Sequence, residues 1–337
     1  MMREPAFWYP PSTWLSRLLM PLGAIYGEVA GSRMARKGVD VGIPVLCVGN
    51  YHVGGAGKTP TTLALVQVLR DLGETPVVLS RGYGGRLHGP VKVDPSRHQA
   101  ADVGDEPLMM ARQVPVVISR DRVAGAALAR STGASVIVMD DGFQNPAITK
   151  DTSFIVIDSN RGLGNGRVLP AGPLRAPLDL QIARTDALVV IGDGVAATGV
   201  AALVAGQGGP VLTARLVPDE TSVTALRGKR VLAFAGIGDP QRFFRTLRHA
   251  GVDVAVEKAF ADHHPYAPGE IDALAAQAKH GGLSLVTTEK DFVKLGSMPA
   301  AAEIVPFAVT LAFEDKAALQ AFVIERLNRA RVKTLRT

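Results

Sequence analysis

The chain has 337 residues, of which 47% are hydrophobic and 20% charged, a composition that excludes an intrinsically disordered protein and gives room for about two domains. Its net charge of +6 favours anionic partners, but no lysine-rich run or basic-aromatic interleaving accompanies that charge, so nucleic acid is not favoured. The single cysteine, Cys47, excludes an internal disulfide and a cysteine-cluster zinc site, and fits a reducing compartment.

Residues 1–37 form an N-terminal segment that contains both tryptophans of the chain and a helical apolar stripe. The apolar run 18–27 is too short to span a bilayer, Pro21 interrupts it, and neither a positive leader nor a cleavage site marks a signal peptide. An apolar face flanked by aromatic and cationic residues suits a helix that lies in a membrane surface, although a helix packed on its own domain has the same pattern. The stripe consists of Leu15, Leu18, Leu19, Leu22, Ile25 and Tyr26.

Residues 45–72 have the order of a phosphate-binding P-loop: a short apolar strand, a glycine-rich turn, Lys58-Thr59 and an amphipathic helix. Glycines let the backbone amides point at phosphate oxygens, and the helix N-terminus adds its dipole. His52 stands where the usual pattern has its first glycine. The sequence therefore predicts a nucleoside triphosphate site whose Lys58 reaches the phosphates and whose Thr59 hydroxyl ligates Mg²⁺. The predicted nucleotide-binding residues are Val53, Gly54, Gly55, Ala56, Gly57, Lys58, Thr59 and Pro60.

Short apolar runs alternate with helical stretches from residue 38 to residue 210, which predicts an α/β domain of the P-loop NTPase type, with a mostly parallel sheet between two helical layers. We expect residues 211–227 to be a two-stranded connector around a Pro-Asp turn. Residues 228–337 then read as a second, smaller α/β/α domain that ends in a helix over 316–331. The predicted strands of the first domain are 45–48, 76–80, 114–119, 136–139, 154–158 and 187–191.

Two pairs of acidic residues follow the P-loop. Asp140 and Asp141 end the predicted strand 136–139 and have the form of a Walker B element, in which one carboxylate binds Mg²⁺ or its water and the other orients the shell. Asp105 and Glu106 open a predicted helix, where acids serve either as caps or as a base beside a metal ligand. Spacing alone does not decide between these two roles.

Cationic loops and a histidine pair complete the candidate residues. The loops 80–85, 119–122 and 160–178 carry arginines that can bind phosphates through bidentate hydrogen bonds, or that are simply solvated. His263 and His264 precede a helix of the second domain, and their spacing does not suit a single metal ion. A histidine here can face substrate only if the second domain closes on the first.

Together these segments resemble the tetraacyldisaccharide 4'-kinase family of lipid A synthesis, in order and over nearly the whole chain. In that family the first-glycine position of the P-loop is not held as glycine, so His52 agrees with the resemblance. The matching segments are GNYHVGGAGKTP (49–60), SRGYGG (80–85), GDEP (104–107), SRDR (119–122), VMDDGFQNP (138–146), LPAGPLR (169–175), AFAGIGDPQRFF (233–244), FADHHPY (260–266) and TTEKDFVKL (287–295).

The resemblance implies transfer of the γ-phosphoryl group of ATP, with Mg²⁺, to the 4'-hydroxyl of an acylated glucosamine disaccharide 1-phosphate. Asp105 matches the proposed general base, assisted by His263 of the DHH motif, although His264 is left open. Glu106, Asp140 and Asp141 match the metal and nucleotide acids. Tyr83, Arg120 and Arg175 lie in motifs expected to face the lipid.

The family also implies a peripheral protein at the cytoplasmic face of the inner membrane, with no obligate protein partner, which favours a membrane-facing role for residues 1–37. Three other hypotheses remain at this stage. A GTPase-like switch lacks its guanine-recognition sequence [N/T]-K-x-D here. A membrane-bound ATPase that needs a partner would make no phosphorylated lipid, and a soluble sugar kinase would be indifferent to acyl chains.

Overall fold

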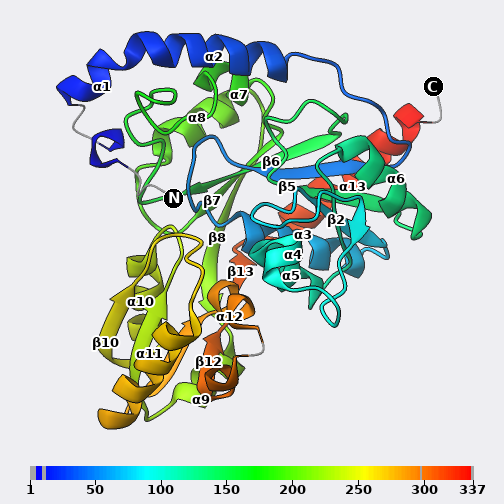
Figure 1. Cartoon of the computed structure of the whole chain (residues 1–337). Helices are drawn as coiled ribbons and strands as arrows, with labels where there is room; N and C mark the ends of the chain where they lie inside the picture. The colour runs from blue at the N-terminus through cyan, green and yellow to red at the C-terminus, as the bar shows by residue number, and fades with distance from the viewer. Residues whose placement is uncertain (1–4, 10–12, 297, 335–337) are drawn as a thin grey trace.

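The computed structural model describes residues 5–9, 13–296 and 298–334, and its strands form two sheets (Figure 1). In the larger sheet β1 lies at the centre, between β5 and β6, and all neighbouring strands are parallel except the two edge pairs. In spatial order the nine strands are β13 (Val309–Phe313), β8 (Val211–Pro218), β7 (Ala187–Ile191), β6 (Thr152–Asp158), β1 (Val45–Gly49), β5 (Val136–Asp140), β2 (Pro76–Ser80), β4 (Val116–Ile118) and β3 (Val91–Lys92).

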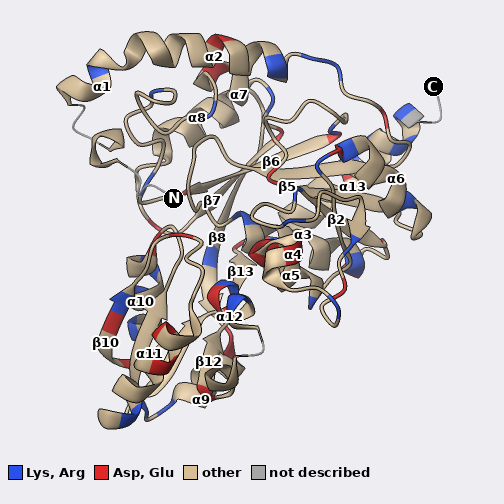
Figure 2. Cartoon of the chain, in the orientation of Figure 1, with Lys and Arg blue, Asp and Glu red and all other residues tan. Residues whose placement is uncertain are grey.

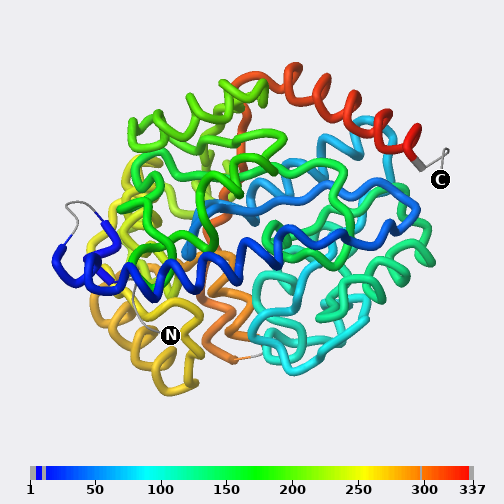
Figure 3. The backbone as a smooth tube through the Cα atoms, turned by 90° about the horizontal axis from the view of Figure 1, so that it is seen from above, coloured from blue at the N-terminus to red at the C-terminus, as the bar shows by residue number. Residues whose placement is uncertain are grey.

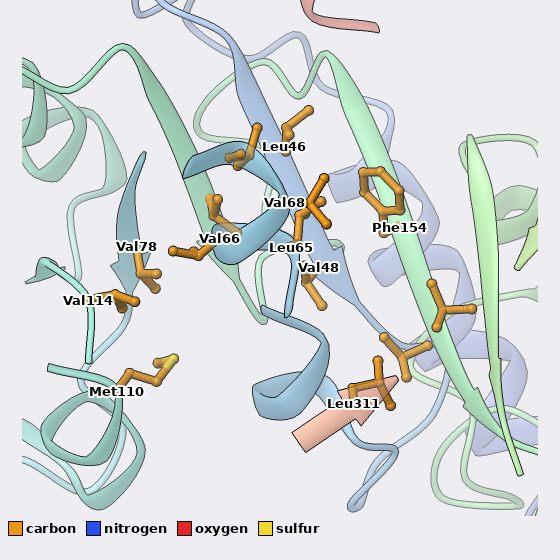
Figure 4. Close-up of a cluster of buried hydrophobic side chains, with 14 of the residues drawn as sticks. Leu46, Val48, Leu65, Val66, Val68, Val78, Met110, Val114, Phe154 and Leu311 are labelled. Carbon is orange, nitrogen blue, oxygen red and sulfur yellow. The ribbon is translucent and has the colours of Figure 1, made fainter. Parts of the chain in front are cut away.

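The larger sheet is buried on both faces, because alternate residues of its strands enter two separate hydrophobic clusters. Leu46 and Val48 of β1 pack under α3 (Lys58–Asp71) together with Phe154, as Figure 4 shows. Cys47 points to the other face and is fully buried there, in agreement with a core role. The first layer of helices consists of α3, α5 (Asp105–Ala111) and α13 (Lys316–Thr334). The second contains α2 (Met20–Met34), α6 (Arg122–Ser131), α7 (Leu178–Ile182) and α8 (Thr198–Gly206).

The smaller sheet is parallel throughout and also has helices on both faces. Its strands, in spatial order, are β10 (Asp253–Ala259), β9 (Arg230–Ala235), β11 (Ser284–Thr288) and β12 (Ile304–Phe307). The helices around it are α9 (Glu220–Leu226), α10 (Pro240–His249), α11 (Pro268–His280) and α12 (Glu289–Leu295), with the 3₁₀ turn η2 (Pro299–Glu303). We call residues 13–218 with 309–334 the large lobe, and residues 219–296 with 298–308 the small lobe. The predicted α/β class with a mostly parallel sheet is confirmed.

The predicted connector is wrong in its second half. Residues 211–218 form β8, but α9 follows where a second strand was expected, because Asp219 caps a helix by accepting from the amide of Ser222. The strand that pairs antiparallel with β8 is β13, about ninety residues further along the chain. β8 and β13 together therefore carry the chain into and out of the small lobe (Figure 1).

The prediction that the C-terminal helix belongs to the second domain is also wrong. Leu319, Val323 and Leu327 of α13 are buried in the same cluster as the β1 and α3 side chains of the large lobe. β13 precedes α13 and places it there, since β13 is the edge strand of the larger sheet. The large lobe is thus completed only by residues 309–334.

α2 has an unusual distribution of side chains. Its buried positions include Gly23, Gly27 and Gly31, and a Cβ at Gly31 would lie 2.7 Å from Leu180. Its large apolar residues are instead exposed: Leu22, Ile25 and Val29 each have more than half of their surface accessible. Seen from above, α1 (Trp14–Leu18) and α2 run across the outside of the large lobe (Figure 3). Within the described part of the chain, no helix combines the length and apolarity needed to cross a bilayer.

Candidate active site

The predicted P-loop forms a tight turn between β1 and α3. Gly54 and Gly57 have φ values of 105° and 93°, which side chains rarely tolerate, and a Cβ at Gly57 would lie 2.5 Å from Ile191. α3 begins at Lys58, and no side chain caps this end of the helix. Its first backbone amides are therefore suited to binding an anion. The loop therefore has the backbone geometry that phosphate binding requires.

His52 replaces the first glycine of the P-loop pattern for a structural reason. The residue is buried and forms a β-bridge with Leu174, and its Nδ1 lies 2.8 Å from the carbonyl oxygen of Val53. Burial lowers the pKa of His52 to about 4, so the ring is neutral at physiological pH. His52 therefore joins the P-loop to the loop that carries Arg175.

Asp140 and Asp141 lie at the carboxyl end of β5, beside β1, as the predicted Walker B element requires. Asp140 is buried and accepts hydrogen bonds from Thr62 (3.3 Å) and Ser80 (3.4 Å). Asp141 has a positive φ of 47° and turns its carboxylate toward Arg175 (2.8 Å) and Lys58 (3.7 Å). The two neighbouring acids thus have different surroundings.

The pKa values of these two carboxyl groups move in opposite directions. Burial, together with the charges of Glu106 and Asp141, raises the pKa of Asp140 to about 7. Burial acts in the same sense on Asp141, but Lys58 and Arg175 outweigh it and lower the pKa of that carboxyl to about 2. The two carboxyl groups therefore differ mainly in their pairing, because burial dominates at Asp140 whereas Lys58 and Arg175 outweigh it at Asp141.

Glu106, Asp140 and Asp141 line one cavity and present carboxylate oxygens, which are ligands that magnesium takes. Among the described residues no group of three His, Cys, Asp or Glu side chains is arranged to hold a metal ion by itself. Magnesium commonly takes only one or two protein carboxylates and keeps its other ligands as water and substrate phosphate. The shared cavity of Glu106, Asp140 and Asp141 is the observation that supports a magnesium ion held partly by water and phosphate.

Asp105 and His263 come from different lobes and meet. Asp105 is the first residue of α5, His263 lies in the loop before α11, and Asp105 Oδ2 is 2.9 Å from His263 Nδ1. Burial raises the pKa of Asp105, but the hydrogen bond from His263 and the charges of Lys290 and Lys294 outweigh it and lower that pKa to about 2. His264 instead contacts Glu270 within the small lobe at 3.1 Å. The structure therefore pairs His263, and not His264, with Asp105.

Two lysines of α12 were not among the predicted site residues. Lys290 Nζ lies 2.8 Å from Glu106 and 3.3 Å from His263 Nε2, and Lys294 Nζ lies 3.7 Å from Asp105. Their i, i+4 spacing places both on one face of α12, which contacts α5. The run KDFVK contains this signal, since both lysines stand within the motif TTEKDFVKL. Figure 2 shows the basic and acidic residues where α12 approaches α5.

Two further contacts join the lobes near the P-loop. Arg242 of α10 forms an ion pair of 2.8 Å with Asp158, at the end of β6, and Asp158 is almost fully buried. Gly238 lies so close to the P-loop that a Cβ at this position would be 3.5 Å from the amide nitrogen of Gly55. The loop after β9 therefore lies over the phosphate-binding turn.

A cavity of about 400 Å³ adjoins the carboxylates on the side of α2. Tyr83 and Arg175, two of the three predicted substrate residues, line it, and the Tyr83 ring lies edge-on to that of His263. Arg120 does not line this cavity, and it is exposed. The P-loop glycines are also outside the lining, which includes Tyr26, Arg33, Val53, Ser80, Arg81, Tyr83, Glu106, Arg122, Asp140, Asp141, Gln144, Leu169 and Arg175.

Comparison with known families gives a match over residues 15–328 to the family described as tetraacyldisaccharide-1-P 4'-kinase. A protein named tetraacyldisaccharide 4'-kinase from Rhodopseudomonas palustris (strain HaA2) is 67% identical over 334 residues, covering 98% of this chain and 99% of that protein. A protein of the same name from Bradyrhizobium diazoefficiens is 66% identical over 331 residues, covering 98% of each.

Among solved structures, the chain is similar to LpxK from Aquifex aeolicus, which was crystallised in complex with ATP. The TM-score is 0.73 at 27% sequence identity, and the match covers 93% of this chain and 99% of that one. The likeness therefore includes both lobes.

Proposed function

This chain belongs to the tetraacyldisaccharide-1-P 4'-kinase family, and we propose that it transfers the γ-phosphoryl group of ATP to the 4'-hydroxyl of a tetraacyldisaccharide 1-phosphate. The product is the 1,4'-bisphosphorylated lipid of lipid A synthesis. The observation that carries the proposal is the contact of 2.9 Å between Asp105 and His263. Asp105 is followed by Glu106, which lines a cavity with Asp140 and Asp141. A carboxylate paired with a histidine at this point suits removal of a proton from an attacking hydroxyl.

The P-loop supplies the binding half of the proposed reaction. The amides of 54–59 would surround the phosphates, and Lys58, which lies 3.7 Å from Asp141, would neutralise phosphate charge. Mg²⁺, bound beside Thr59, Glu106, Asp140 and Asp141, would neutralise charge that develops on the transferred phosphoryl group. Phosphoryl transfer depends mainly on such positioning and neutralisation.

Asp105 is the proposed general base. Its oxygen Oδ2 accepts from His263, so the other carboxylate oxygen is the one that the acceptor hydroxyl can approach. Asp105 Oδ1 also accepts from the amide of Glu106, which fixes the plane of the carboxylate. The helix start, the histidine and two lysines thus hold the base in one orientation.

The cavity of about 400 Å³ is the proposed acceptor site. Tyr83 and Arg175 line it together with the carboxylates, and Tyr26 and Arg33 of α2 line it as well. Arginine suits the anionic 1-phosphate through paired hydrogen bonds. Arg120, the third predicted substrate residue, is exposed and lies outside this lining.

The N-terminal helices are the proposed contact with the inner-membrane surface, at its cytoplasmic face. Leu18, Leu22 and Ile25 are exposed on one side of α1 and α2, while the glycine side faces the protein. An exposed apolar stripe of this kind gains free energy when it lies in a lipid interface. Because α2 also lines the cavity through Tyr26 and Arg33, a lipid could enter from the membrane side.

The test follows γ-labelled ATP with Mg²⁺ and the acylated disaccharide 1-phosphate in detergent, with purified full-length chain. We expect label in the lipid, and loss of that label when EDTA removes the metal ion. Phosphate release without labelled lipid would contradict the kinase and favour an ATPase. A preference for GTP would contradict the proposal that ATP is the phosphoryl donor. Equal rates with a water-soluble acceptor that lacks acyl chains would contradict the proposal of a lipid acceptor.

A further inference from the structure

A second cavity, of about 630 Å³, lies on the large lobe beside the C-terminal end of α2. Residues 34–40, residues 143–153, the turn after α7 and the end of α13 contribute to its lining. Figure 2 shows Lys and Arg where the chain leaves α2 and near the C-terminal end of α13. Asn145 lines both this cavity and that of the candidate active site, but the carboxylates of the active site line only the other one. The cationic residues of the second cavity are Arg36, Lys37, Lys150, Arg184 and Lys333.

The backbone holds one wall of this cavity in place. Val39 makes backbone hydrogen bonds of 2.9 Å with Ala147 and with Thr149. The Thr149 hydroxyl also donates to the carbonyl of Gly38 at 3.0 Å, and a Cβ at Gly38 would lie only 2.4 Å from the backbone of Ile148. The segment that follows α2 is therefore fixed against the segment that precedes β6, and cations from both segments line the same cavity.

The cations of this lining have few acidic partners. Among the residues that the structure describes, Lys333 alone of the five forms an ion pair, with Asp151 at 3.8 Å. Lys150 is half-buried, and its ammonium donates to the carbonyl of Asn145 at 2.6 Å. Arg184, also half-buried, donates to a backbone carbonyl at 3.0 Å. Burial lowers the pKa of Lys150, and the charge of Arg184 acts in the same direction, so a bound anion would stabilise both cations.

The two acidic residues of the lining do not balance this charge. Asp186 accepts from the amide of Ser153 at 2.8 Å and pairs at 3.3 Å with Arg326, which is not one of the five lining cations. Asp40 accepts from the amide of Gly42 at 2.8 Å. The cavity therefore keeps an excess of positive charge, and partly buried charges of this kind favour a partner of opposite sign.

We propose that this cavity is a second phosphate-binding site, in which Lys150 and Arg184 bind the phosphate group and the exposed Arg36 and Lys37 attract it. Arginine suits phosphate through paired hydrogen bonds, and lysine acts as a point charge. α2 ends at Met34, so a phospholipid headgroup at the proposed membrane surface would bring a phosphate to this point. A soluble phosphate compound has the same chemistry. The site is separate from the proposed transfer reaction and does not depend on it.

The binding test uses the full-length protein with its P-loop saturated by a non-hydrolysable ATP analogue and Mg²⁺, so that the probe does not bind there. Calorimetry then measures the binding of dihexanoyl phosphatidic acid, a soluble phosphate ester. We expect Lys150→Met to weaken this binding by about tenfold or more, because a charged donor is lost. The double variant Arg36→Gln with Lys37→Gln should weaken it by about threefold to tenfold, and both positions are exposed, so folding is not at risk.

Two control variants separate this site from its surroundings. Lys279→Met, at an exposed position of α11, makes the same change in net charge and should bind the probe as wild type does. Arg175→Met removes an arginine of the acceptor cavity and should also leave this binding unchanged. The inference would be overturned if the wild type did not bind the probe, if Lys150→Met and the double variant bound it as wild type does, or if Arg175→Met lost as much affinity as Lys150→Met.

Two further measurements identify the source of the phosphate. In sedimentation with vesicles of phosphatidylcholine and phosphatidylglycerol, binding that is weakened by about threefold or more in Lys150→Met would identify a lipid headgroup. Unchanged vesicle binding, with inorganic phosphate competing against the short-chain lipid in calorimetry, would support the same site with a soluble phosphate compound. None of these measurements uses phosphoryl transfer, so failure of the lipid-kinase proposal would show separately, as a wild type that does not phosphorylate lipid.

Discussion

The two halves of the candidate site are built in different ways. The nucleotide half, residues 53–60 with Asp140 and Asp141, comes from two adjacent strands of one sheet and the loops that follow them. The proton half, Asp105 and Glu106 with His263 and Lys290, joins a helix start of the large lobe to the small lobe. The first half needs only a correctly folded β1–α3 and β5, whereas the second exists only while the lobes are docked.

This difference separates binding from chemistry. α12 stabilises the contact between the lobes, because Val293 is buried in the core of the large lobe and Leu295 is buried in the core of the small lobe. A change in the proton half should therefore lower the transfer rate and leave nucleotide affinity intact. A change in the nucleotide half should affect both.

The largest effect is expected for Asp105→Asn, which keeps the shape of the side chain and removes its basicity. We expect kcat for lipid phosphorylation to fall by about 10³-fold, since a general base contributes roughly 10² to 10⁴. The dissociation constant for ATP should stay within about threefold of wild type, as measured by calorimetry. Asp272→Asn, at an exposed position of α11, is the control. Wild-type turnover in Asp105→Asn would exclude Asp105 as the base.

Lys58→Met is expected to lower kcat by about 10²- to 10³-fold, because one charged donor to the phosphates is lost. Unlike Asp105→Asn, it should also weaken ATP binding by about tenfold or more. A variant with normal ATP affinity would contradict the division of the site.

Acid sensitivity of folding should report on the cross-lobe contacts. The pKa of Asp105 is about 2 in the folded chain and 3.8 in its ordinary state, so between these values the unfolded chain binds more protons. This carboxylate therefore contributes stability that is present above pH 3.8 and is lost as the pH falls toward 2, to a total of about 2 kcal/mol. In urea unfolding from pH 5 to pH 2, Asp105→Asn should lose less stability than wild type by about that amount. If the unfolding free energies of wild type and Asp105→Asn changed equally with pH, the contacts assigned to Asp105 would be contradicted.

Arg242→Met removes an ion pair that joins the lobes without touching the proton half. Asp158 keeps hydrogen bonds from two backbone amides, so we expect a modest loss, about 1 to 3 kcal/mol of unfolding free energy and a kcat lowered by less than about tenfold. Arg245→Met, on the same helix and more exposed, should change neither. A loss of kcat as large as that of Asp105→Asn would show that lobe docking alone governs the rate.

The smallest effect on turnover in detergent is expected for Ile25→Ser, because this side chain is 65% exposed. Stability should change by less than about 0.5 kcal/mol. Binding to vesicles that contain anionic phospholipid should weaken by about threefold to tenfold, since apolar surface no longer enters the lipid interface. Ile324→Ser, 43% exposed on α13, is the control in the other helical layer. Unchanged vesicle binding would contradict the membrane role of α2.

Most of the large lobe could be predicted because its signals are local. The strands at 45–48, 76–80, 136–139 and 187–191 are short apolar runs bounded by helices or turns, and each is a strand of the sheet. The chain after residue 211 was harder, since α9 follows a Pro-Asp pair that equally suits a hairpin, and capping by Asp219 decides for a helix. β13 joins the larger sheet by pairing with β8, and no local sequence pattern predicts this pairing.

Site residues divide in the same way. Gly57, Lys58 and Asp140 each lie in a short sequence motif that can be identified from about a dozen residues. The structure brings them together at the carboxyl ends of β1 and β5. The contact of Asp105 with His263 was expected only through family resemblance, because 158 positions separate them. Lys290 was missed, although its motif was recognised, since a lysine at the start of a short helix is most often solvated.

The sequence by itself determined the α/β class, the P-loop turn and the acids that end β5, because continuous apolar runs, glycine conformation and strand-end position are properties of short segments. Only the tertiary structure decided which histidine meets Asp105, that α12 supplies two lysines, and that the last strand and helix complete the large lobe. Those outcomes depend on how the chain leaves the larger sheet along β8 and returns along β13, bringing distant segments within hydrogen-bonding distance.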